Sequence, residues 1–234
     1  MKGVLLIACV GPMQSWGTRS RFQERDTERE PSKSGIVGML CAALGRDREE
    51  PVEDLAALMM GVRVDREGII AKDFQTAENV AVASGGSPNS LISNRYYLAN
   101  AAFLVGLEGD VLLLEKLHVA LANPKWPVFL GRKSYVSSAP SYLADGLVRD
   151  RNLRNALTEY PLLISDKETD FRKRKIKENN DDGRVRLVLE SATPTHETRR
   201  DHPVSYSLGR RMFRERFVVT EYLDLASCGG KGDD

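Results

Sequence analysis

The sequence predicts an α+β protein of 234 residues whose N-terminal domain has a ferredoxin-like order of elements. Over residues 1–140, apolar runs of strand length and helical patterns follow in the order strand, helix, strand, strand, helix, with a β-prone stretch after them. A stretch rich in Gly, Ser, Pro and Asn interrupts this order at about 75–100. Residues 141–234 change to short strands and charged loops, which predicts a smaller, β-rich C-terminal region.

An apolar strand, an exposed loop and a helix open the chain. Residues 2–10 (KGVLLIACV) form a continuous apolar run ended by Gly-Pro, which is typical of a buried central strand. The charged residues of 17–32 alternate in sign and predict a long exposed loop. Apolar residues then follow helical spacing over 33–45, where Gly45 is a typical C-terminal stop.

A second helix and a hairpin are expected next. Pro51 suits a helix start, so a short helix is predicted from Val52 to Met59. The β-prone residues 61–66 and 68–75 predict a hairpin around Glu67-Gly68.

The interrupting stretch and the elements after it complete the N-terminal domain. Residues 76–99 have a Gly-Gly-Ser-Pro-Asn-Ser centre and predict an excursion from the core, either an extended hairpin or a mobile loop. Residues 101–107 return to a buried strand, Val111–Ala122 form a helix, and 127–136 are β-prone. RRM-type RNA-binding domains share this ferredoxin-like arrangement, but the same fold carries many other activities.

The C-terminal region is predicted from shorter signals. Strands are expected at Leu162–Ser165, Arg184–Ser191 and Arg214–Leu223. Residues 167–182 are predicted to form a flexible, solvated loop because their charges nearly cancel, although a nucleic-acid contact is the alternative. The tail 226–234 is expected to be disordered.

Composition narrows the class of protein. A chain with 41% hydrophobic residues can bury a real core, and a net charge of +1 does not by itself indicate a polyanionic partner. Cys9, Cys41 and Cys228 are expected to be buried free thiols, since the chain has no C-x-x-C pair. The N-terminal apolar run is too short to span a bilayer, so we expect a cytoplasmic protein without a membrane partner.

Two motifs near the N-terminus suggest a site for a phosphate-bearing, base-stacking ligand. The block Gly11–Gly17 leaves a strand with an amide, Gln14, and an exposed-type aromatic, Trp16. The block Pro31–Gly35 opens a helix, where unpaired N–H groups, the helix dipole and Lys33 favour an anion. Ordinary capping by Ser32 or Ser34, with glycines for packing, explains the second block equally well.

Three further basic motifs are candidates. In Phe129–Tyr135, a glycine followed by Arg-Lys-Ser can form a nest for phosphate oxygens, or a turn with solvated charges. Arg95 flanks two tyrosines, a combination suited to a splayed base and its phosphate but also to packing in a strand. Residues 199–216 carry six arginines, an excess that fits an anionic partner or plain solubility.

The histidines do not define an active site. His118 lies in a leucine-rich helix, and His196 and His202 lack the spacing of a zinc motif. Metal-independent RNA cleavage needs a base near the 2′-OH and a cation on the phosphate, and no spacing singles out such a set. We therefore expect no metal and no cofactor.

Three of these motifs closely resemble a known family. The segments GPMQSWG at 11–17, PSKSGIVGMLCAALGR at 31–46 and FLGRKSYVSSAPSYL at 129–143 are similar to the CasD family, the 5′-handle-binding subunit of the type I-E CRISPR Cascade complex, in the RAMP superfamily. The closing RERFVVTEYL resembles the terminal strand of that family less specifically.

The resemblance implies a non-catalytic subunit in antiviral defence. Members clamp the 5′ handle of the CRISPR RNA and cap the backbone of the complex. They also carry a β-hairpin thumb, at about 75–100 in this chain, that reaches over the guide. Partners would be the backbone-forming subunit, the large PAM-recognising subunit and, through the complex, target DNA. The alternative function is metal-independent cleavage of CRISPR repeat RNA. In a related CRISPR branch the counterpart of this subunit is such an endoribonuclease, with a catalytic Tyr–Lys–His set.

By motif position, the resemblance assigns base contacts, phosphate contacts and a contact of the thumb with the guide to nine residues. They are Gln14, Trp16, Lys33, Ser34, Arg46, Arg95, Arg132, Lys133 and Ser134.

Overall fold

The computed structural model describes residues 1–18, 23–81, 85, 89–178 and 181–229. Within these residues, nine strands form one sheet. Seven of them lie side by side in the order β6-β1-β5-β3-β7-β9-β8, and the other two, β2 and β4, pair with β5. Every pairing is antiparallel except that of β2 with β5. The predicted α+β class is confirmed.

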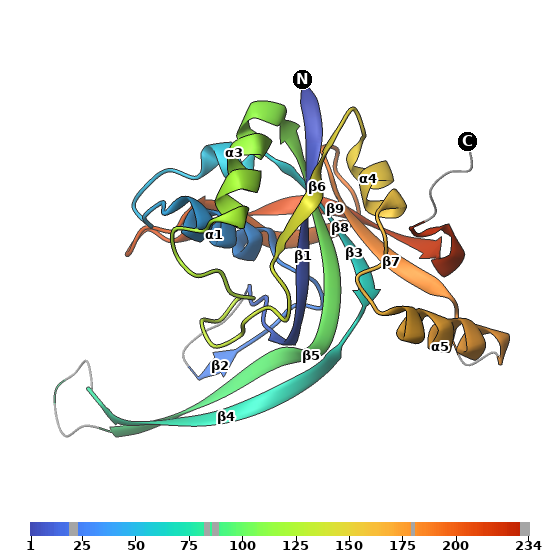
Figure 1. The fold of residues 1–234 in the computed structure, drawn as a ribbon. Coiled ribbons are helices and arrows are strands. Elements are labelled where there is room, and N and C mark those ends of the chain that lie inside the picture. Colours follow the sequence, from blue (N-terminus) through green and yellow to red (C-terminus); the bar gives the residue numbers. More distant parts are fainter. Residues whose placement is uncertain (19–22, 82–84, 86–88, 179–180, 230–234) are drawn as a thin grey trace.

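The centre of the sheet is buried on both faces (Figure 1). Strand β1 (Lys2–Gln14) turns Leu5, Ile7 and Cys9 toward α1 (Lys33–Leu44) and α3 (Val111–Ala122), while Val4 and Leu6 face α4 (Leu153–Glu159). Because successive side chains of a strand point to opposite faces, burial on both sides explains the unbroken apolar run of β1.

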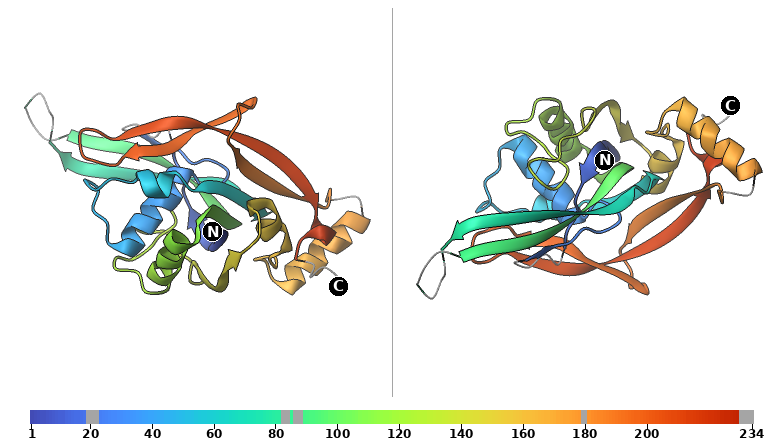
Figure 2. Two further views of the ribbon diagram at one scale, coloured as in Figure 1. Left: turned by 90° about the horizontal axis from the view of Figure 1, so that it is seen from above. Right: turned by 90° about the horizontal axis from the view of Figure 1, so that it is seen from below.

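Strand β5 (Asn89–Asp110) is 22 residues long and has two different neighbours along its length. Its C-terminal part pairs with β3 (Met59–Arg66), and its N-terminal part pairs with β4 (Ile69–Val80). The predicted hairpin of 61–66 with 68–75 is therefore wrong: β3 and β4 are successive partners of one long strand. Strands β4 and β5 instead form a hairpin that extends well beyond the rest of the sheet (Figures 1 and 2).

The sheet continues from β3 into the C-terminal half of the chain. Strand β7 (Arg184–Ser191) pairs with β3 and with β9 (Met212–Asp224), and β8 (Glu197–Ser205) lies beside β9. The predictions of strands at 184–191 and 214–223 are confirmed. Strand β6 (Tyr142–Arg149) lies on the other side, next to β1. The domain boundary near residue 140 stays a prediction.

Helix α1 ends as predicted, and α3 has the predicted bounds. Gly45 adopts a left-handed φ of 71° and its N–H reaches the carbonyls of Ala42 and Cys41. The second helix, α2 (Glu53–Ala56), is shorter than predicted because β3 already begins at Met59. Cys9, Cys41 and Cys228 are buried free thiols, as expected.

Four expectations about irregular segments are corrected. Residues 127–136 and 162–165 are not strands, β1 continues past Gly11-Pro12, and residues 226–229 are ordered. The 3₁₀ turn η1 (Leu225–Ser227) leads to Cys228, which packs in the core beneath α4. The rest of the predicted disordered tail, 230–234, lies outside the described residues.

The predicted flexible loop 167–182 is also corrected, because it begins with the helix α5 (Asp166–Lys177). Ser165 caps this helix by accepting the N–H of Glu168. Acidic residues occupy its first turn and basic residues its last turn, which complements the helix dipole. The charges that nearly cancel in composition are thus ordered along the helix axis.

Candidate nucleic-acid interface

Positive side chains gather where the long hairpin leaves the sheet. The short strand β2 (Glu24–Arg25) pairs in parallel with β5 and sets Arg25 beside Arg95. On its other side, β5 pairs with β4, where Asp73 lies directly opposite Arg95. Arg95 is half-buried and donates to the Ser93 hydroxyl at 3.4 Å.

The 129–135 loop adds its cations to the same place. The Arg132 guanidinium donates to the Tyr135 hydroxyl at 2.8 Å, to the Tyr96 carbonyl at 2.8 Å and to the Arg25 carbonyl at 3.2 Å. Arg132 therefore joins the loop to β5 and β2. Lys133 and Ser134 follow in an exposed turn. We call Arg25, Arg95, Arg132 and Lys133 the hairpin-root patch.

Gly131 shapes this loop in a way that differs from a phosphate nest. Its φ is +91°, and a Cβ at this position would lie 1.7 Å from the Ser15 carbonyl oxygen. The glycine thus allows close packing of the loop against the end of β1, where Ser15 donates its N–H to the Leu130 carbonyl.

Gln14 and Trp16 lie in the core, which corrects the expectation that they are exposed for base contacts. The indole is 1% exposed and donates from Nε1 to the Gln14 side chain at 3.2 Å. The Gln14 amide in turn donates to the carbonyls of Cys9 and Ala101. Gly35 of α1 packs on the ring, where a Cβ would lie 2.8 Å from the indole. No ring face is left for a base.

The start of α1 is filled by the protein itself, so the expected phosphate site there is corrected too. The Asp201 carboxylate accepts the backbone N–H of Lys33 at 2.6 Å, and Ser32 caps Gly35. The Lys33 ammonium is 1% exposed and paired with Glu190 at 2.8 Å. Burial lowers the pKa of Lys33, and the Glu190 carboxylate opposes that shift. Ser34 is half-buried beside this cap.

Two other predicted basic groups are engaged internally. Arg46 forms a bidentate ion pair with Asp54, which ties the end of α1 to α2. Within the arginine-rich 199–216 segment, Arg216 is buried against Asp201 and Arg199 is paired with Glu30. Of the nine predicted site residues, the structure brings together Arg95, Arg132, Lys133 and Ser134. Gln14, Trp16 and Lys33 are buried, Ser34 is half-buried, and Arg46 is paired with Asp54.

Sequence reasoning missed two cations near the hairpin root. Arg25 was assigned to an exposed loop, and only its pairing with β5 sets it beside Arg95. Lys72 is exposed on β4 with its ammonium 5.9 Å from the Tyr96 ring centroid. A Lys opposite a Tyr on paired strands indicates a candidate RNA contact, but only the strand register shows that Lys72 and Tyr96 are opposite each other.

The described residues contain no group of three or more His, Cys, Asp or Glu side chains placed to hold a metal ion. None of the helices in the described ranges is both long enough and apolar enough to cross a membrane.

The fold is that of a CRISPR-associated protein. The family model described as "CRISPR-associated protein (Cas_Cas5)" matches residues 4–219. The chain belongs to this Cas5 family. An Escherichia coli (strain K12) protein, "CRISPR system Cascade subunit CasD", is 28% identical over 179 residues, which cover 68% of this chain and 78% of that protein.

Two solved structures have the same fold. One, described as "Crystal structure of Cas protein", has a TM-score of 0.74 and 46% sequence identity, and the match covers 96% of this chain and 97% of the other. The second, described as "CRISPR RNA-guided surveillance complex", has a TM-score of 0.73 and 30% identity over 98% of this chain and 95% of the other. The predicted resemblance to the CasD family is confirmed.

Proposed function

We propose that this chain is a subunit of a CRISPR RNA-guided surveillance complex and that it holds the 5′ handle of the CRISPR RNA at the hairpin-root patch. The observation that carries this proposal is the convergence of Arg25, Arg95, Arg132 and Lys133 from three separate segments at one place. Single-stranded RNA is held by cations that follow its backbone and by aromatic groups near its bases. The similarity to a chain described as "CRISPR RNA-guided surveillance complex" supports the proposal that this chain is a subunit of such a complex.

We assign different roles to the cations of the patch. The Arg132 guanidinium already donates hydrogen bonds to Tyr135, Tyr96 and Arg25, so we assign it the role of orienting the loop. Lys133 is exposed beside it and is the better phosphate contact. Arg95 contacts the guide at the base of the hairpin, with Asp73 limiting the local excess of charge.

The long hairpin acts as the thumb in this proposal. Ile70, Phe74 and Ile92 are exposed and share one face, since Phe74 lies opposite Asn94 and Thr76 opposite Ile92 in the register. Arg95 lies on the other face. We infer that the face with Phe74 and Ile92 contacts the backbone-forming and PAM-recognising subunits, while the face with Arg95 and Asp73 meets the guide. The chain would thereby cap the backbone and reach target DNA only through the complex.

The ferredoxin-like unit in this proposal consists of β1, α1, β3, β5, α3 and β6. Its support is the β-α-β-β-α-β chain order together with the adjacent positions of β6, β1, β5 and β3 in the sheet.

We also propose that the subunit does not cut RNA. A Tyr, a Lys and a His do occur near the start of α1, but the Tyr and the Lys are engaged with other groups of the protein. Tyr206 donates to the Ser34 carbonyl, and burial raises its pKa. Lys33 is paired with Glu190, and burial lowers the pKa of the half-buried His202, with Lys33 adding to that shift. The internal bonds of Tyr206 and Lys33 therefore support a non-catalytic role.

Replacing Arg95 and Lys133 together with glutamine is expected to weaken binding of repeat-derived RNA and to reduce its salt dependence. Each phosphate contact to a single strand contributes about 0.7 to the slope of log K against log salt, so the slope should fall by about 1.4. Fluorescence anisotropy with the purified chain over a salt series measures this. Repeat RNA incubated with the wild-type chain in EDTA should be recovered uncut.

Arg48→Gln with Lys116→Gln is the matched control, because both cations are exposed and the change in charge is the same. The control should keep the wild-type slope. Equal slopes for the two double variants would contradict the site, and specific cleavage of the repeat would contradict the non-catalytic role.

Replacing Phe74 and Ile92 with threonine is expected to reduce recovery of the assembled complex at least tenfold without unfolding the chain. Threonine suits a strand but removes most of the exposed apolar area, and each apolar side chain buried at an interface contributes about 1.5 kcal/mol or more. Co-purification with co-expressed neighbouring subunits and a CRISPR array measures assembly. A variant with Leu112→Gln and Val119→Gln on α3 removes two similarly exposed apolar groups and should assemble. Full recovery of the hairpin variant would argue against the thumb.

A further inference from the structure

Helix α5 is attached to the protein along one side only. Ile176 packs against the core beneath α4, Arg172 pairs with Asp181, and Glu168 pairs with Arg66 of β3. No residue of this helix is fully buried. At 1.5 Å per residue, 12 residues expose a side about 18 Å long.

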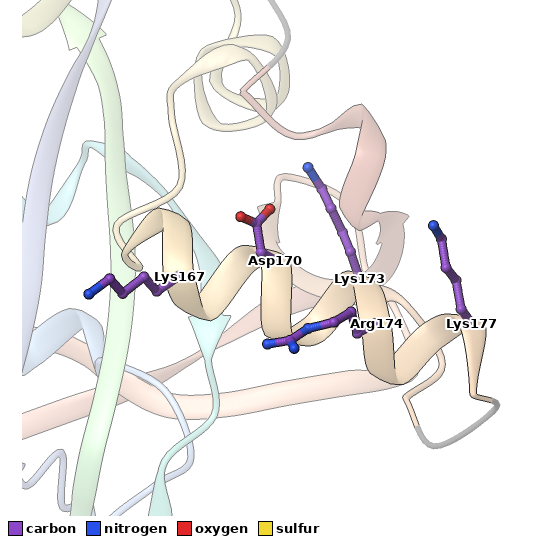
Figure 3. Close-up of a pocket in the computed structure, with 5 residues that line it drawn as sticks. All are labelled: Lys167, Asp170, Lys173, Arg174 and Lys177. Carbon is purple, nitrogen blue, oxygen red and sulfur yellow. The ribbon is translucent and has the colours of Figure 1, made fainter.

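The outer side of α5 carries an excess of positive charge. Lys167, Asp170, Lys173, Arg174 and Lys177 line a shallow hollow there (Figure 3). Lys173 and Lys177 extend on the same side as Asp170, and Lys167 and Arg174 on an adjacent side. None of these four cations forms a salt bridge with any residue that the structure describes.

An aromatic ring lies beside one of these cations, Arg174, and beside Lys175. Phe171 is 51% exposed, with the Arg174 guanidinium 5.9 Å and the Lys175 ammonium 5.5 Å from its ring centroid. The exposed part of the phenyl ring can stack a base next to cations that contact its phosphates.

We propose that the outer side of α5 binds a single-stranded nucleic acid through its phosphates and one stacked base. A solvated helix with basic residues at its C-terminal end is the simpler explanation, but it accounts only for the last turn. Lys167 in the first turn is disfavoured by the helix dipole, and Phe171 leaves about half of its apolar surface in water. A polyanion with bases accounts for both.

This site is separate from the hairpin-root patch. Both views of Figure 2 show the hairpin and α5 at opposite ends of the molecule. The inference depends only on the chemistry of α5, so it stands or fails independently of the proposed handle binding.

The test is the binding of a fluorescein-labelled, mixed-sequence 20-nucleotide strand to the full chain, as DNA and as RNA, over a salt series. Replacing Lys173, Arg174 and Lys177 with glutamine should lower the slope of log K against log salt by about 2, since each contact contributes about 0.7. Phe171→Leu should weaken binding of the strand about tenfold while leaving binding of a DNA duplex unchanged. The DNA and RNA arms show which strand is preferred.

Two variants make the result specific. The control variant carries Arg48→Gln, Lys116→Gln and Lys125→Gln, three exposed positions outside α5. It loses the same charge and should keep the wild-type slope of log K against log salt. Asp170→Lys adds a cation to the same side of the helix and should tighten binding, a gain that misfolding cannot produce. The inference is overturned if the α5 triple variant keeps the wild-type slope, if it matches this control, or if Asp170→Lys does not tighten binding.

All measurements are repeated in the Arg95→Gln, Lys133→Gln chain with the mixed-sequence strand and with repeat-derived RNA. An α5 effect that persists while repeat RNA ignores Arg95 and Lys133 would overturn the proposed function alone. The reverse pattern would overturn this inference alone.

Discussion

Trp16→Ala is expected to destabilise the fold by about 3–5 kcal/mol, the usual cost of removing a large buried aromatic. The indole is 1% exposed, its N–H is bonded to Gln14, and Gly35 packs on its ring. Removing the ring leaves a cavity between β1 and α1 and leaves one acceptor of the Gln14 amide without its donor. Equilibrium unfolding in urea measures the loss as a lower midpoint.

Trp126→Ala is the matched control, because Trp126 is 43% exposed. Its loss should change the free energy of unfolding by less than about 1 kcal/mol. A Trp16→Ala protein with wild-type stability and weakened RNA binding would show that the ring contacts RNA instead of the core.

The contrast between these two tryptophans shows why sequence alone misassigned part of the site. The residues Gln14, Trp16 and Lys33 have the chemistry that RNA recognition needs, and their motifs did identify the family. Their burial depends on partners far along the chain: Ala101, Asp201 and Glu190. A local pattern contains no information about a partner more than eighty residues away. The same motif is therefore compatible with an exposed binding site and with side chains buried in the core.

Elements with strong local signals were predicted well. The start of β1, the ends of α1 and α3, and strands β7 and β9 follow from periodicity, capping residues and apolar runs. The β3–β4 segment failed for a different reason. Its two halves look like a hairpin, but both pair with β5, whose length of 22 residues no local pattern reveals.

Arg63→Met is expected to be as damaging as the loss of Trp16, at about 3–5 kcal/mol, because it removes one partner of a fully buried ion pair. Arg63 and Asp65 are both 0% exposed and form two hydrogen bonds, at 2.6 and 3.0 Å. The guanidinium also donates to the carbonyls of Leu157, Tyr160 and Pro161. Without it, three carbonyls and the Asp65 carboxylate stay buried with too few donors.

The alternating segment GVRVDR conceals this role. Alternation normally predicts charged side chains on a solvent face. Here β3 lies between β5 and β7, and α4 covers the face on which Arg63 and Asp65 lie. The pair thus fastens the segment after α4 to the middle of the sheet, with Asp65 also accepting the N–H of Leu163 at 2.7 Å.

A series of substitutions separates the ion pair from simple loss of volume. Arg214→Met, at an exposed position of β9, should change the free energy of unfolding by no more than about 0.5 kcal/mol. Arg63→Met combined with Asp65→Leu should be more stable than Arg63→Met alone, because it no longer buries an unpaired carboxylate. If the double variant were the less stable of the two, Asp65 would stabilise the fold chiefly through Leu163 instead of through Arg63. The guanidinium would then be a minor part of the junction between α4 and the sheet.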